Sequence, residues 1–110
     1  MLRVVEKNII LAERPRVARD PWTRARGMIG RDFLDCDALI FPGCRAVHTC
    51  FMGMALDLLF VDEARRVVAV RAEVRPWRIA MGPCGSRTVI ELPAGRLCGM
   101  DVGMGDALSW

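Results

Sequence analysis

The feature that most constrains the fold is an apolar run interrupted by a single acid. Residues 56–61 are Leu-Asp-Leu-Leu-Phe-Val, and residues 66–74 follow with apolar side chains at alternate positions. Alternation is typical of β-strands, and the four residues between the runs are a common hairpin loop. The sequence therefore predicts a β-hairpin whose first strand carries three large apolar side chains on one face: Leu56, Leu58 and Phe60.

Asp57 lies on the opposite face of that strand, together with Leu59 and Val61. A carboxylate in such a place costs several kcal/mol unless it is paired with a cation or accepts strong hydrogen bonds. We expect one of two partners, an arginine of the 24–31 segment, which we favour, or backbone N–H groups at a loop. Asp57 is then a structural clamp, and the alternative is a ligand-facing acid beside His48.

Other short apolar runs predict further strands. They lie at 4–5 with 9–11, 38–41, 46–52, 88–92 and 107–110. Residues 14–20 are polar and interrupted by a proline, and residues 76–86 are predicted to form a loop. Strands this short and numerous favour a mainly β (α+β) fold, a small barrel-like or folded-over antiparallel sheet.

One short helix is predicted near residues 21–30. Asp20 is a competent N-cap, and Pro21 sits at the first helical position, where its missing N–H costs nothing. One apolar face then follows the i, i+3, i+7 spacing of a helix through Trp22, Ala25 and Ile29.

Length and composition indicate one globular domain over 1–110. Apolar residues make up 53% and charged residues 26%, which is typical of a folded chain. The formal net charge is +3, and every basic residue except Lys7 is arginine. Because the arginines are scattered and form no stripe, nucleic-acid binding is not expected.

The five cysteines favour a reducing compartment. Their number is odd and no CxxC occurs, which does not fit a secreted disulfide framework. Residues 1–11 contain no apolar core of a secretory signal. No run approaches the roughly 18 apolar residues of a membrane span. We therefore expect a cytoplasmic protein with no membrane partner, and oligomeric state is not indicated.

His48 is the only histidine. It is a candidate base or ligand, and the alternative is a hydrogen-bonded structural histidine. In a strand, His48, Cys50 and Met52 would project together, which is a donor set suited to copper(I). The cysteine spacing matches no common zinc site, so neither a metal nor another cofactor is expected.

An arginine-rich segment supplies a candidate anion site. Arg24 and Arg31, with Arg26 between them, could face Trp77 and Arg78; the alternative is an ordinary solvated helix surface. The predicted ligand-binding residues are therefore His48, Asp57, Arg24, Arg31 and Trp77.

Several motifs together resemble one protein family. They are Arg24-Ala25-Arg26-Gly27-Met28-Ile29-Gly30-Arg31, Val47-His48-Thr49-Cys50-Phe51-Met52 leading to 56–62, Glu91-Leu92-Pro93-Ala94-Gly95, and Gly105-Asp106. In this order, over essentially the whole chain, they resemble the domain-of-unknown-function 192 family. The resemblance implies a compact, mainly β domain with one short helix, and it implies no reaction.

The leading hypothesis is a small cytoplasmic binding or accessory domain with a shallow polar site near His48 and Asp57 for a small anionic ligand. The first alternative is a small enzyme acting on an anionic metabolite, with His48 as base and Asp57 as its orienter. The second is a copper(I)-binding protein. No nucleophile elbow or other catalytic constellation is present, so no catalytic residue is assigned.

Overall fold

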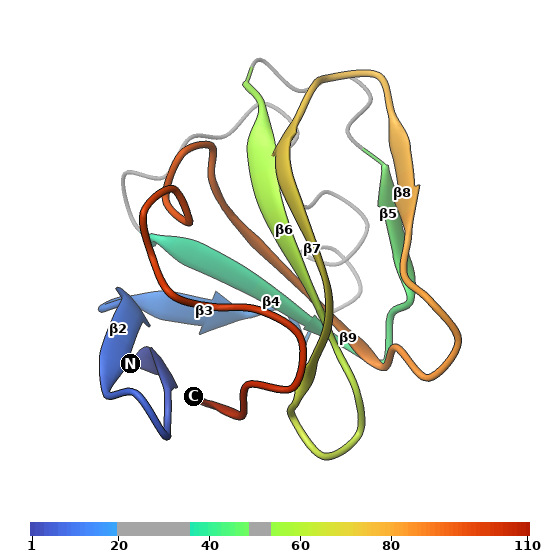
Figure 1. The fold of residues 1–110 in the computed structure, drawn as a ribbon. Helices are drawn as coiled ribbons and strands as arrows, with labels where there is room; N and C mark the ends of the chain where they lie inside the picture. Colours follow the sequence, from blue (N-terminus) through green and yellow to red (C-terminus); the bar gives the residue numbers. More distant parts are fainter. Residues whose placement is uncertain (20–35, 49–53) are drawn as a thin grey trace.

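The computed structural model describes residues 1–19, 36–48 and 54–110 (Figure 1). The helix predicted near 21–30 and the end of the strand predicted at 46–52 lie outside these described residues. Within them there is no helix. Accordingly, no helix in the described ranges has the length and apolar character to cross a membrane.

The described residues form ten strands in three sheets. A five-stranded sheet has the order β3-β4-β9-β6-β7, a three-stranded sheet the order β10-β1-β2, and β5 pairs with β8. The strands are β1 (Leu2–Val4), β2 (Ile9–Ala12), β3 (Pro15–Val17), β4 (Ala38–Pro42), β5 (Ala46–His48), β6 (Leu56–Val61), β7 (Val67–Val74), β8 (Ile79–Met81), β9 (Thr88–Pro93) and β10 (Leu108–Ser109).

The five-stranded sheet is covered on both faces (Figure 1). On one face, β1, β2, β10 and the segment after β9 enclose the first core, which includes Leu2, Leu11, Leu59, Ile90, Leu97 and Leu108. On the other face lies the second core, which includes Leu39, Phe41, Leu56, Leu58, Phe60 and Val89, with Val47 of β5 and Ala80 of β8 packed against it. Covering both faces explains why the central strands are continuous apolar runs.

The predicted hairpin is confirmed. β6 and β7 are antiparallel neighbours. Leu56, Leu58 and Phe60 belong to the second core, whereas Leu59 and Val61 belong to the first. In the connecting turn, one oxygen of Asp62 accepts hydrogen bonds from the amides of residues 64 and 66, both at 2.9 Å.

Three expectations about the sheet need correction. The barrel-like or single folded-over sheet is not confirmed, because separate layers cover the two faces of one open sheet in the described part. β3 runs parallel to β4. Pro15 is the first residue of β3, which is possible because an outer strand tolerates a missing backbone N–H. β8 lies within the predicted loop 76–86. It is only three residues long, and its residues Ile79 and Met81 are exposed. Such a short, exposed strand lacks the apolar periodicity by which a longer strand is recognised.

A glycine lets the two-stranded β5–β8 ribbon rest directly on the second core. Gly82 follows β8, and its N–H donates to the Arg45 carbonyl at 2.8 Å. A Cβ added at Gly82 would lie 2.5 Å from Cδ1 of Phe60 and would also overlap the Ser86 side chain. No side chain fits between the ribbon and the sheet at this point.

Replacing Gly82 with alanine should therefore destabilise the fold. We expect Gly82→Ala to lower the free energy of unfolding by about 1–3 kcal/mol, because the new methyl group overpacks the contact with Phe60. The control is Gly103→Ala, where an added Cβ meets nothing within 4 Å. Urea unfolding measures both variants, and equal stabilities would contradict the proposed close approach.

Candidate functional site

Asp57 is buried and bonded to two backbone amides. The residue is only 1% exposed. Its Oδ1 accepts a hydrogen bond from the Glu73 N–H at 2.8 Å, and its Oδ2 accepts one from the Leu97 N–H at 2.9 Å. Backbone N–H groups are the second of the two partners predicted for this carboxylate. The favoured partner, an arginine of the 24–31 segment, lies outside the described residues.

These two bonds connect separate parts of the chain. The pairing of β6 with β7 shifts between Leu56 and Leu58, whose partners are Val74 and Arg71. Within this bulge Glu73 has a φ of 52°, a left-handed conformation that is uncommon for a residue with a side chain. The carboxylate holds the bulge on one side and the turn after β9 on the other, so Asp57 clamps the fold.

Asp57 also lines a small cavity of about 300 Å³. The walls are largely apolar and include Val70, Leu97 and Val102. Each carboxylate oxygen already accepts a strong hydrogen bond from the protein, so the acid has limited capacity for a ligand in this cavity. The clamp accounts for Asp57 without one.

The other predicted ligand-binding residues are placed elsewhere. His48 ends β5, where its backbone pairs with Ile79 of β8, and Trp77 precedes β8 and is 58% exposed. The ribbon packs on the second core, whereas Asp57 faces the first. The structure thus groups His48 with Trp77 and separates both from Asp57, while Arg24 and Arg31 lie outside the described residues.

The predicted His48–Asp57 pair stays a prediction, because the side chain of His48 lies outside the described residues. A base and the acid that orients it must lie within hydrogen-bonding reach; the backbone of β5 lies on the second-core side of the sheet, whereas Asp57 faces the first core. The copper(I) set stays a prediction too, because Cys50 and Met52 lie outside the described residues. In the described ranges no three histidine, cysteine or acidic residues gather as metal ligands.

Glu91 is a second buried acid. It sits at the centre of β9, 2% exposed, between Leu39 of β4 and Leu58 of β6. Its Oε2 is buried, and no described group donates a hydrogen bond to it. Burial raises the pKa of Glu91 to about 8. Like Asp57, Glu91 is an acid within an apolar run, Val89–Leu92, so the same sequence pattern could have identified it.

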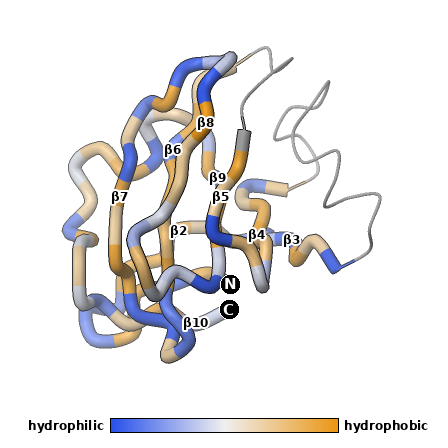
Figure 2. The backbone as a smooth tube through the Cα atoms, turned by 90° about the vertical axis from the view of Figure 1, so that its right-hand side faces the viewer, coloured by the Kyte–Doolittle hydropathy of each residue, from blue (hydrophilic) through white to orange (hydrophobic). Residues whose placement is uncertain are grey.

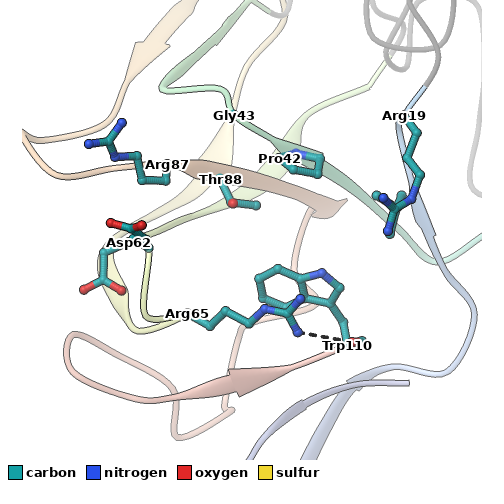
Figure 3. Close-up of a pocket in the computed structure, with 10 residues that line it drawn as sticks. Arg19, Pro42, Gly43, Asp62, Arg65, Arg87, Thr88 and Trp110 are labelled. Carbon is teal, nitrogen blue, oxygen red and sulfur yellow. Dashed lines mark hydrogen bonds between the residues drawn. The ribbon is translucent and has the colours of Figure 1, made fainter.

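An arginine-lined cleft of about 450 Å³ lies where several loops meet (Figure 3). Arg87 and Arg19 lie at opposite ends of it, with Thr88 and Pro42 between them. Along the lower wall, the guanidinium of Arg65 stacks 4.1 Å from the ring centroid of Trp110 and donates to its carbonyl at 3.3 Å. We call this site the arginine cleft.

The charges of the arginine cleft are unequal. Three arginines face two acids, Asp62 and Glu63, and Asp62 already accepts bonds from its own turn. Among the described residues, neither Arg19 nor Arg87 forms a side-chain hydrogen bond or ion pair. The residues that line the cleft come from five separate places in the chain. No single local sequence motif could therefore have identified this site.

Comparisons with known proteins place the chain in a family. The family model DUF192, described as "Uncharacterized ACR", matches residues 4–110. The chain belongs to this family, as the motifs predicted. A curated relative, a UPF0127 protein of Thermococcus sibiricus, is 32% identical over 65 residues, which are 59% of this chain and 42% of that protein. The chain thus matches less than half the length of that relative.

Two solved structures share the fold. A protein of unknown function from Novosphingobium aromaticivorans has a TM-score of 0.76 and 23% identity, and the match covers 87% of this chain and 74% of that one. A protein of Sinorhizobium meliloti, provisionally described as a transcription regulator, has a TM-score of 0.75 and 22% identity, with 86% and 79% covered. At these identities the likeness concerns the fold alone.

The clamp can be tested with the smallest change to the Asp57 side chain. We expect Asp57→Asn to lower the free energy of unfolding by about 1–3 kcal/mol, because an amide NH₂ would face one of two N–H donors that need an acceptor. Urea unfolding measures the loss. A variant as stable as the wild type would mean that the two amides do not depend on the carboxylate.

Glu91 should make stability depend on pH. A folded-state pKa near 8 lies above the ordinary value, so the folded chain retains a proton that the unfolded chain has lost. The free energy of unfolding should then fall as pH rises from about 5 to 8, by up to about 1.4 kcal/mol per pH unit, and level off above this range. In Glu91→Gln this decline should be absent. An identical pH slope in the variant, measured by urea unfolding, would assign the effect to other groups.

Proposed function

We propose that the chain is a small cytoplasmic binding domain for a small anion and that the arginine cleft is its site. This proposal keeps the anionic ligand expected from the sequence but moves its site away from His48 and Asp57. The observation that carries it is the pair of guanidinium groups, Arg19 and Arg87, at the two ends of one cleft with no ion-pair partner in the described ranges.

The shape and chemistry of the cleft support a small ligand. Its volume falls in the range of roughly 300–1,000 Å³ that is typical of small-molecule sites. Guanidinium groups recognise carboxylate and phosphate through paired hydrogen bonds. Between the two ends, the Thr88 hydroxyl offers a further hydrogen bond (Figure 3), and the Arg65 guanidinium is held in place by its stacking on Trp110.

A binding role agrees better with this site than catalysis does. The cleft contains arginines, two acids and a hydroxyl, but no histidine or cysteine among its lining residues. Among these described residues, no general base has a third group to orient it. The enzyme alternative, with His48 as base and Asp57 as its orienter, stays a prediction from the sequence.

The proposal is tested by titrating the protein with phosphate and with citrate at constant ionic strength. We expect saturable binding in calorimetry and a rise in melting temperature. Arg19→Gln and Arg87→Gln should each weaken binding by about tenfold, since each removes a charged hydrogen bond. Arg3→Gln, an exposed arginine on β1, is the matched control. Absence of binding, or an equal loss in the Arg3 variant, would refute the proposed site.

A further inference from the structure

The β5–β8 ribbon presents large apolar side chains to solvent. Ile79 is 78% exposed, Met81 is 61% exposed, and Trp77, just before β8, is 58% exposed. Ala80, between the two exposed strand residues, packs on the second core. Because neighbouring strand residues point to opposite sides, Ile79 and Met81 project outward together. In Figure 2 the residues of β8 are coloured as hydrophobic.

The described segments that form the ribbon and its connections carry arginine as their only charged residue type. Residues 38–48 and 74–90, which form the ribbon and its connections, contain four arginines and neither aspartate nor glutamate. Arg45 lies at one end of β8, where its Nε donates to the Gly82 carbonyl at 3.2 Å. Arg78 lies at the other end and donates to the carbonyls of Pro76 and Trp77. Cations thus stand at both ends of the apolar side chains.

We propose that the ribbon docks on an anionic phospholipid bilayer through Trp77, Ile79 and Met81. Acidic headgroups would meet the arginines, the indole would lie at the interface, and the two aliphatic side chains would enter the acyl boundary. The expectation of no membrane partner came from the lack of membrane-spanning runs, and surface docking requires none.

Charge and chemistry favour a bilayer over the other occupants. A second copy of the same ribbon would bring arginines against arginines. A single-stranded nucleic acid would satisfy the charge, but its bases need aromatic surfaces for stacking, and two of the three exposed side chains are aliphatic. A bilayer matches both the charge and the aliphatic groups.

The test is co-sedimentation of the whole chain with vesicles of phosphatidylcholine alone and of phosphatidylcholine mixed with phosphatidylserine. We expect binding to the mixed vesicles only, and a decrease in binding as salt rises. Ile79→Ser combined with Met81→Ser should lower the partition coefficient at least about tenfold. Arg75 directly follows β7, on the connection to β8. Arg75→Gln combined with Arg78→Gln should lower the partition coefficient about fivefold for each charge removed.

Met104→Ser is the matched control, because Met104 is 79% exposed and lies outside the ribbon. It should bind vesicles like the wild type. Binding to neither vesicle, an equal loss in the Met104 variant, or binding to single-stranded oligonucleotides without binding to vesicles would each overturn the proposal. Dimerisation through the ribbon would overturn the proposal too. It would appear as a larger species that the double variant Ile79→Ser with Met81→Ser abolishes. Anion binding in the arginine cleft is measured without vesicles, so the two proposals can fail separately.

Discussion

The two hydrogen bonds accepted by the Asp57 carboxylate are the constraint on which much of the fold depends. β6 lies between β9 and β7, and Asp57 binds one amide in the turn after β9 and another near the end of β7. Its bond to Leu97 is notable because the Leu97 side chain is buried in the first core. Leu97 thus donates its N–H to the carboxylate and places its side chain in the core. The hydrogen bond and the hydrophobic contact therefore hold the same segment in the same position.

Other aspartates organise loops in the same way. Asp37 accepts bonds from the Glu13 and Arg14 amides, both at 2.7 Å, and so ties the β2–β3 turn to the start of β4. Asp106 accepts from the Gly103 amide at 2.9 Å and from Lys7 at 3.1 Å, which links the end of the chain to its start and holds the pKa of Asp106 below its usual range. Short strands leave much of the backbone outside sheet ladders, and carboxylates satisfy some of those amides.

Sequence periodicity was sufficient for the buried central strands and insufficient for two of the short outer strands. β6 was predicted with its bounds and its faces, because a buried strand leaves a long apolar run. β3 and β8 were missed, since each has three residues and lies at the edge of its sheet. The acid at Asp57 was rightly predicted to need neutralisation, but pattern alone could not choose between a guanidinium and backbone amides, which depends on how distant loops approach one another.

The covering of both sheet faces also explains why the candidate site lies away from the residues that the strand pattern emphasised. The side chains of the central strands β4, β6 and β9 are enclosed, so the charged groups available to a small ligand come from the connections between strands. Arg19, Arg65 and Arg87 each occupy such a connection, and Trp77 lies in another. Glu91 is the exception that needs a cause: its Oε2 is buried with no donor among the described residues, and an acid so placed lowers stability at neutral pH.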